Sequence, residues 1–329
     1  MRNLITDVPG LKVGHAEDAA LGSGATAVIF DEPAVASIDL RGGGPGTRET
    51  ALLDPAQTVQ GIDAITLSGG SAFGLDSASG VQAWLRQQGR GFAVRTARVP
   101  IVPAAILFDL LSGGDKDWGR YPPYRELGYA AAASAATDFA LGSVGAGAGA
   151  TTVNCKGGVG SASAQSPEGF LVGALAVVNA AGSVTVGRGP WFWAAPFELN
   201  GEYGGRGLPD AFSSQALEPV TKGSARESTT LVVVATDAVL TKAQAKRLAV
   251  MAQSGLSRAI YPVHSPLDGD VVFAASTGRR PLADATLGLT ALGTLAANVA
   301  ARAIARGVFA AAALPLAGSM PSWHDQFGH

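Results

Sequence analysis

The first third of the chain alternates short apolar runs with glycine-rich turns. Residues 25–30, 35–40 and 64–67 are rich in Ala, Val, Ile and Leu, and each run ends at small or polar residues. Apolar runs of this length between turn residues predict strands. Residues 71–88 instead carry apolar side chains at helical spacing and stop at Gly89, which predicts a helix.

The rest of the chain shows the same two patterns. Strands are predicted over 157–164, 170–178, 229–235 and 271–274, helices over 126–140, 241–255 and 283–305, and a short apolar segment over 104–111. The helix that starts at Thr241 has Gln244 three residues later, which is a capping-box pair, and Gly255 is its expected end.

These elements define a fold class. Strands and helices mix without strict alternation, so we expect an α/β or α+β protein, built as a layered sandwich with helices outside. Residues 196–226 are the most polar and turn-rich part and are the best linker candidate. Residues 289–316 are apolar but contain Arg302 and Arg306, so we expect a buried helix there rather than a membrane span.

Composition narrows the class of protein. The 329 residues suggest roughly two domains or one large one. Lys and Arg number 24 against 26 Asp and Glu, so the net charge of −2 gives no basic field for nucleic acid or an anionic membrane. Hydrophobic residues are 47% of the chain and charged residues only 15%, which excludes a disordered chain. Because few charged groups are present to solvate the surface, we expect part of it to be covered by other copies of the chain. The single cysteine, Cys155, and the polar start of the chain lead us to expect a cytoplasmic protein.

Familiar cofactor and catalytic motifs fail on inspection. The glycines of 145–150 match a dinucleotide-binding pattern, but the residues after them are a poor helix start. The glycine-rich loop at 42–46 lacks the Lys of a phosphate-binding loop, and the residues around Ser71 do not form a hydrolase elbow. The four histidines show no metal spacing. We therefore expect no metal, nucleotide or other cofactor.

One chemistry needs neither histidine nor metal. A Thr or Ser at the start of a polypeptide carries its own base, the α-amino group. To place such a residue in mid-chain, the precursor must cut itself before it. A polar linker that runs into a buried strand at Ser228, Thr229 and Thr230 fits this requirement. A threonine that simply opens a strand is the ordinary alternative.

Motifs along almost the whole chain add to this pattern. The sequence resembles the L-aminopeptidase/D-esterase family, which includes β-peptidyl aminopeptidases and 6-aminohexanoate-oligomer (nylon oligomer) hydrolases. The matching segments, in chain order, are ITDVPGLKVGH at 5–15, RGGGPGTRE at 41–49, LSGGSAFGL at 67–75, GAG at 145–147, KGGVGS at 156–161, TT at 229–230, ATDA at 235–238 and DGD at 268–270.

The resemblance implies a fold and an assembly. We expect one αββα sandwich domain over 1–329, of the N-terminal-nucleophile type, which cuts itself into an α chain, 1–228, and a β chain, 229–329. The cleaved heterodimers would assemble into tetramers or octamers.

The resemblance also implies site residues. Thr229 would be the nucleophile, with Lys156 beside it to set its protonation, and Asn179 would donate to the oxyanion. Asp268 and Asp270 would orient the nucleophile and tune its amine.

The same resemblance gives Tyr124 as a substrate-binding wall or donor, with Tyr121 equally close by sequence. Many nylon-hydrolase members have Asn before the nucleophile, where this chain has Ser228, which should permit cleavage but leaves its rate open.

Each expected site residue also has an ordinary structural interpretation. Lys156 could be a solvated loop lysine, Asn179 could end its strand in a turn, and 268–270 has the composition of a hairpin turn. We expect Cys155 to be inert and His264 to be structural.

The function predicted is a self-processing aminopeptidase or amidase that acts on short peptides or amides through an acyl-enzyme on Thr229. The alternatives are an endo-hydrolase of 6-aminohexanoate oligomers, an ornithine-type acetyltransferase, and an uncleaved, non-catalytic member of the family.

Overall fold

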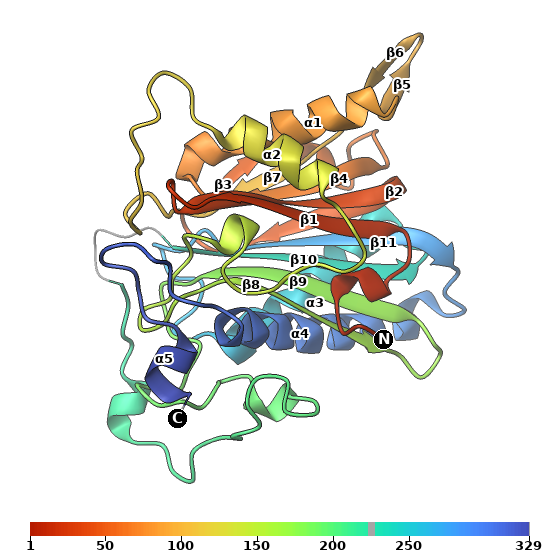
Figure 1. Cartoon of the computed structure of the whole chain (residues 1–329). Helices are drawn as coiled ribbons and strands as arrows, with labels where there is room; N and C mark the ends of the chain where they lie inside the picture. The colour runs from red at the N-terminus through yellow and green to blue at the C-terminus, as the bar shows by residue number, and fades with distance from the viewer. Residues whose placement is uncertain (223–227, 329) are drawn as a thin grey trace.

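The computed structural model describes residues 1–222 and 228–328, and its elements lie in four layers (Figure 1). Two sheets pack face to face in the middle, and a pair of helices covers the outer face of each. This arrangement confirms the expected αββα sandwich, an α+β fold.

The strand β2 joins the two sheets. Its first half pairs with β1 and β4, and its second half pairs with β11. The strand order is β3-β7-β4-β2-β11-β10-β9-β8, with β1 also on β2. The bounds are β1 (Leu11–Asp18), β2 (Ser23–Leu40), β3 (Gly46–Arg48), β4 (Ile62–Ser68), β7 (Ala104–Ile106), β8 (Val159–Gln165), β9 (Leu171–Asn179), β10 (Thr229–Ala238) and β11 (Val271–Arg280).

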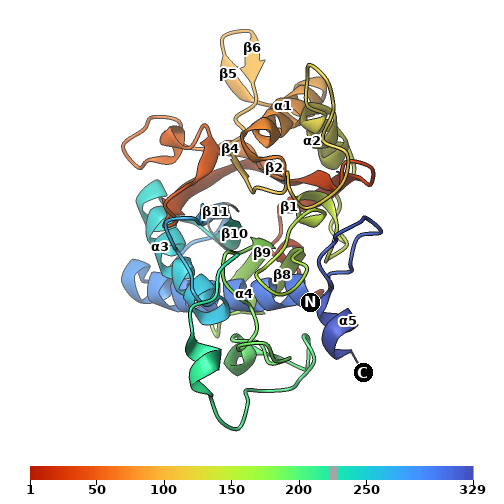
Figure 2. The same cartoon turned by 90° about the vertical axis from the view of Figure 1, so that its left-hand side faces the viewer.

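Helices α1 and α2 cover the first sheet, and α3 and α4 cover the second (Figure 1). A separate hairpin of β5 (Phe92–Val94) and β6 (Ala97–Val99) projects from the body (Figure 2). The helices are α1 (Ser77–Gln87), α2 (Tyr124–Ala133), α3 (Lys242–Ala259), α4 (Ala285–Phe309) and α5 (Trp323–Phe327), and the 3-10 turns are η1 (Ile5–Asp7), η2 (Ala51–Leu53), η3 (Ser71–Asp76), η4 (Gly145–Gly147), η5 (Ala195–Phe197) and η6 (Ser214–Leu217).

Strand β10 is buried on both faces. Leu231 and Val233 belong to the apolar core between the sheets, whereas Val232 and Val234 belong to the core under α3 and α4. Successive side chains of a strand point to opposite faces, so a strand with cores on both sides needs an unbroken apolar run. This explains why the run that starts at 229 shows no polar alternation.

The predicted strands are present, with two differences. The segments 25–30 and 35–40 are halves of one 18-residue strand, β2, whose pairing with β4 shifts register between Ile29 and Ala34. The polar residues between the halves lie at this shift, where the strand passes from one sheet to the other. Strands β1, β3, β5 and β6 were not predicted: the outer half of β1 is polar and exposed, and each of the other three is only three residues long.

The helix predictions need three corrections. The helix over 71–88 begins as the 3-10 turn η3 and becomes α1 only at Ser77. The helix predicted over 126–140 ends at Ala133. The helix predicted to stop at Gly255 continues to Ala259, because Gly255 is a packing residue and not a cap. The capping box of Thr241 and Gln244 is confirmed.

Gly255 lies at a close contact between α3 and α4. A Cβ added there would lie 2.4 Å from the carbonyl oxygen of Ala297 and 2.7 Å from Cβ of Ala300. Helix α4 also packs along β8 and β9. The long apolar segment near the C-terminus, which has the length and composition of a membrane span, is therefore a core helix in this fold.

The predicted linker over 196–226 is only partly described. Up to residue 222 it contains the short turns η5 and η6 and little other regular structure. Residues 223–226 of that prediction lie outside the described residues.

Gly255→Ala tests the close helix contact. The new methyl group forces α3 and α4 apart, and we expect a loss of about 1–3 kcal/mol of stability, although alanine favours a helix interior by about 1 kcal/mol. Gly288→Ala in α4 is the control, because the nearest atom there is the flexible Leu282 side chain at 3.0 Å. Thermal unfolding should show a lower midpoint for Gly255→Ala alone, and an unchanged or raised midpoint for that variant would contradict the packing argument.

Candidate active site

Thr229 opens β10 and is only 4% exposed. It pairs with Asn179 across the antiparallel ladder between β10 and β9. The residue before it, Ser228, forms a bridge with Asp268 in the parallel direction. Backbone pairing on both sides of β10 therefore brings three of the predicted site residues together.

The carbonyl group of Ser228 has two close donors. The Thr229 hydroxyl donates to the Ser228 oxygen at 2.7 Å, and the Gly269 N–H donates to the same oxygen at 2.7 Å. A Cβ added to Gly269 would lie 2.7 Å from Thr229 Oγ1, so glycine leaves room for the hydroxyl. The peptide bond between Ser228 and Thr229 is thus polarised by one N–H and faced by one hydroxyl.

Asp270 holds the start of β10 in place. Its Oδ1 accepts the Thr230 N–H at 2.8 Å, and its Oδ2 lies 2.8 Å from Nδ1 of His264 and accepts the His264 N–H at 3.2 Å. Burial raises the pKa of Asp270, and the nearby charge of Asp268 raises it further, whereas the His264 hydrogen bond opposes both. The carboxyl group is therefore fixed on both oxygens.

Asp268 is buried beside it and is held by a different set of donors. Its Oδ2 accepts the N–H and the hydroxyl of Ser265, at 2.9 and 2.7 Å, and its Oδ1 accepts the Ala181 N–H at 3.1 Å. The segment 268–270 is thus a turn, as its composition indicates, and it is also the turn against which the Ser228–Thr229 peptide lies.

Asn179 is the last residue of β9 and is buried. Its Nδ2 donates to the Phe108 carbonyl at 3.0 Å, and its Oδ1 accepts from the Thr151 N–H at 3.0 Å and from Lys222 Nζ at 3.1 Å. These contacts fix the orientation of the amide, with its nitrogen toward Phe108. One N–H of the amide remains beyond the bond to Phe108.

Lys156 is a buried lysine and not a solvated one. Its ammonium donates to the carbonyls of Gly147, Ala150 and Gly157 at 2.8–3.0 Å. Burial lowers its pKa to about 7, against the opposing charge of Asp109. Ala150 adjoins Thr151, which bonds Asn179, so one short loop connects Lys156 to the end of β9.

Tyr124 lies in the interior of the protein. Its side chain is fully buried, with the hydroxyl donating to Ser23 Oγ at 3.1 Å. Ser23 in turn donates to Asp109 Oδ2 at 2.6 Å, and Oδ1 of Asp109 accepts the Gly70 N–H at 2.7 Å. The structure thus places Tyr124 in a cluster around Asp109, while the side chain of Tyr121 is 78% exposed.

Sequence reasoning missed one residue of this region, Asp109, and did not place another, His264, beside Asp270. Asp109 is fully buried, and burial raises its pKa. Its signal was an acidic residue within the apolar segment 104–111. His264, which we expect to be structural, bonds through its ring to Asp270, and its backbone φ of +56° holds it in an uncommon conformation. The contacts of Asp109 cannot be read from sequence, because Ser23 and Gly70 lie in other segments. Asp270 is only six residues from His264, and the fold of the loop between them brings the two side chains together.

The space beside Asn179 is narrow. A cavity of about 50 Å³ lies there, lined in part by Phe108, Thr151 and Lys222. Over the described ranges, 1–222 and 228–328, no group of three or more His, Cys, Asp or Glu side chains is placed to hold a metal ion.

Comparison with known proteins gives this geometry a context. The model of peptidase family S58 matches residues 3–319. An uncharacterized aminopeptidase of Mycobacterium tuberculosis (strain ATCC 25618 / H37Rv) is 44% identical over 99% of this chain and 98% of its own. A 6-aminohexanoate-oligomer endohydrolase of Kocuria sp. (strain KY2) is 27% identical, over 89% of this chain and 82% of its own.

Solved structures agree on the fold. The L-aminopeptidase D-Ala-esterase/amidase of Ochrobactrum anthropi, described as a new variant of the Ntn hydrolase fold, superposes with a TM-score of 0.72 at 20% identity, covering 99% of this chain and 92% of its own. A β-aminopeptidase of Burkholderia sp. gives a TM-score of 0.70 at 22% identity, covering 99% and 92%. With a family match over nearly the whole length and close relatives named as aminopeptidases, this hydrolase of peptide or amide bonds belongs to peptidase family S58.

Proposed function

We propose that the protein is a self-processing aminopeptidase, which cuts itself between Ser228 and Thr229 and then hydrolyses short peptides or amides through an acyl-enzyme on Thr229. The observation that carries the proposal is the pair of 2.7 Å hydrogen bonds to the Ser228 carbonyl oxygen, from Thr229 Oγ1 and from the Gly269 N–H. The relatives at 44% identity are named aminopeptidases, which favours this activity over oligomer hydrolysis or acetyl transfer.

Autocleavage would begin at that carbonyl group. Thr229 Oγ1 gives up its proton and attacks the Ser228 carbonyl carbon, which forms the ester to Oγ1. The bond from this carbon to the Thr229 nitrogen then breaks as that nitrogen takes up a proton and becomes the amine. The Gly269 N–H points at the oxygen on which negative charge develops, as in an oxyanion hole. Water then hydrolyses the ester, which releases the Ser228 carboxylate and a free Thr229 amine.

The new amine supplies the base for substrate hydrolysis. An α-amino group has an ordinary pKa near 7.7–8.0, so a useful fraction is neutral at pH 7 and takes the proton of Oγ1. Nearby carboxylates raise the pKa of an amine and a nearby ammonium lowers it. Asp268, Asp270 and Lys156 would together tune this amine.

Before the cut there is no free amine, so another group must accept the hydroxyl proton. Lys156 suits this step, because burial brings its pKa to about 7. Its three carbonyl partners and the charge of Asp109 favour the ammonium form, and burial favours the neutral amine. The balance leaves both forms populated near neutral pH.

Assembly is part of the same proposal. We propose that the cleaved heterodimers form a tetramer or octamer. The exposed apolar side chains of the β5–β6 hairpin, Phe92, Val94 and Val99, support it, because an isolated two-stranded hairpin is marginally stable in water.

Intact-mass spectrometry tests the cut. Wild-type protein should give two chains of 228 and 101 residues, roughly 23 and 10 kDa by length, with the smaller chain beginning at Thr229. Thr229→Ala should stay at the full mass of 33.0 kDa. Thr230→Ala is the matched control, because it also removes a buried hydroxyl near the start of β10. This variant should still be cut. A wild-type chain that stays whole through prolonged incubation would refute self-processing.

The pH dependence of maturation tests Lys156. Only the neutral amine accepts a proton, so the cleavage rate should rise with pH through about 7 and level off above it. Lys156→Arg keeps the charge, and Lys156→Met removes the amine; both should cut slowly with a flat profile near pH 7. Gel quantification of precursor half-life between about pH 5.5 and 8.5 measures this. If Lys156→Arg shows the same dependence of the cleavage rate on pH as the wild type, Lys156 does not accept the proton.

A substrate panel tests the activity. Cleaved enzyme should release p-nitroaniline from an unblocked L-amino-acid p-nitroanilide, and Thr229→Ala should lose this activity by a factor of at least about 1,000. If 6-aminohexanoate oligomers are cleaved and the p-nitroanilides are not, the endo-hydrolase alternative replaces the aminopeptidase.

A further inference from the structure

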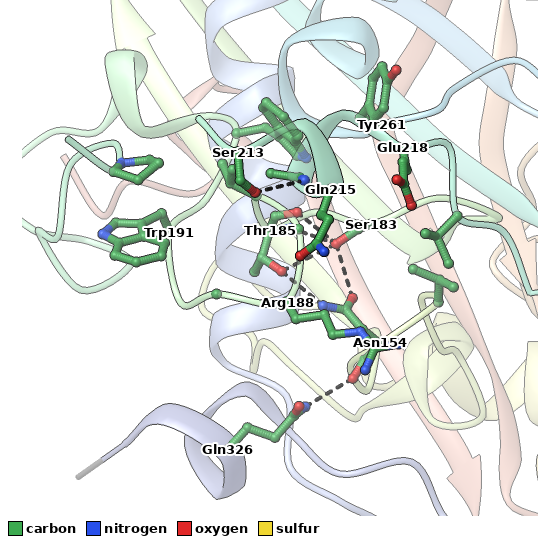
Figure 3. Close-up of a pocket in the computed structure, with 18 of the residues that line it drawn as sticks. Asn154, Ser183, Thr185, Arg188, Trp191, Ser213, Gln215, Glu218, Tyr261 and Gln326 are labelled. Atoms are coloured by element: carbon green, nitrogen blue, oxygen red, sulfur yellow. Dashed lines mark hydrogen bonds between the residues drawn. The ribbon is translucent and has the colours of Figure 1, made fainter. Parts of the chain in front are cut away.

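A cavity of about 850 Å³ lies beside the candidate active site, and its lining contains none of the expected site residues. Figure 3 shows the cavity. The Ala181 N–H bonds to Asp268, and two residues later Ser183 lines this cavity. Its walls come from the loop 183–193, the segment 209–220 and Tyr261. The volume lies in the range of small-molecule binding sites.

Aromatic side chains form one wall. Trp193 stacks on Phe212 with ring centroids 6.0 Å apart and lies 5.5 Å from the ring of Tyr261. The Tyr261 hydroxyl donates to the Leu217 carbonyl at 2.9 Å, which holds the segment 209–220 in place. The buried indole N–H of Trp193 has no hydrogen-bond partner among the described residues. A buried donor without a partner costs free energy. The aromatic rings that line the cavity suit a ligand with a flat apolar group.

The floor of the cavity is polar but already satisfied. Asn154 Nδ2 donates to Thr185 Oγ1 at 2.9 Å, and the Ser183 hydroxyl donates to Asn154 Oδ1 at 3.1 Å (Figure 3). Gln326 donates to the Asn154 carbonyl at 2.9 Å. Because these groups already bond to one another, they fix the shape of the cavity floor. Recognition of a ligand therefore depends on other side chains.

Two opposite charges line the cavity without partners. Within residues 1–222 and 228–328, neither Arg188 nor Glu218 has an ion pair or a side-chain hydrogen bond. Figure 3 shows Glu218 on the opposite side of the cavity from Trp191, with Arg188 and Gln215 between them. An anion alone would face Glu218 and a cation alone would face Arg188, so a ligand with both charges is the one that pairs with the two.

We propose that this cavity binds a short unblocked peptide with an aromatic side chain. Its terminal carboxylate would pair with the guanidinium of Arg188, its terminal ammonium with the carboxylate of Glu218, and its aromatic ring would lie against Trp193 and Tyr261. The proposal does not depend on Thr229 as the nucleophile, since no bond is made or broken in the cavity.

Calorimetric titration of the full-length Thr229→Ala chain with glycyl-phenylalanine tests this. The substitution removes the proposed hydrolysis, so the probe survives. The free dipeptide should bind, and its N-acetylated and C-amidated forms should each bind roughly tenfold more weakly, as expected for loss of one charged hydrogen bond. In Arg188→Met the acid and the amide should bind equally. In Glu218→Gln the free and acetylated amines should bind equally.

Matched controls are Arg86→Met in α1 and Glu32→Gln in β2, exposed residues in the other half of the sandwich, which should keep the parent affinity. Three outcomes would overturn the proposal: no binding of the free dipeptide, binding of the free dipeptide in the Arg188 and Glu218 variants as tight as in the parent chain, or a smaller particle by sedimentation in those variants. The last would make the cavity a contact between copies of the chain. None of these outcomes bears on the cut at Thr229, which mass spectrometry reads separately.

Discussion

The position of β10 between β9 and β11 is the constraint on which the site depends. Pairing with β9 sets Thr229 opposite Asn179, and the parallel arrangement with β11 sets Ser228 beside Asp268. Both faces of β10 are buried, so a slip of one residue would exchange its two apolar faces and move the Ser228 carbonyl away from the Gly269 N–H. The register that builds the core is therefore the register that builds the site.

The same pairing explains how a chain could survive a cut within it. Eight residue pairs join β10 to β9 from Thr229 to Thr236, and β11 pairs with β2. Helix α4 packs on β8 and β9, across the proposed boundary. Pieces that share two sheets and an apolar core stay associated without the covalent link, because separating them would expose that core to water. The loss of one peptide bond therefore destabilises only the residues at the new chain ends.

Burying charged groups at this site costs the protein stability. Lys156, Asp109 and Asp270 lie in the interior, and burial shifts the pKa of each toward the neutral form. Ionised groups away from water are unfavourable unless they are paired or hydrogen-bonded. Each of the three is surrounded by backbone or hydroxyl partners, which holds its geometry while its charge stays adjustable, and such groups are typical of functional sites.

The sequence by itself determined the layers and the starting point of β10. The unbroken apolar run after Thr229 and the capping box at Thr241 depend on neighbours in the chain, and the structure agrees with both. Tertiary structure alone decided that 25–40 is one strand, that Gly255 continues a helix, and that Asp109 and His264 belong to the site region. The strand, the helix contact and the surroundings of Asp109 depend on partners distant in sequence, whereas the His264–Asp270 contact depends on how the loop between them folds. Periodicity and turn chemistry report only local energetics. Long-range packing fixed what local pattern left open.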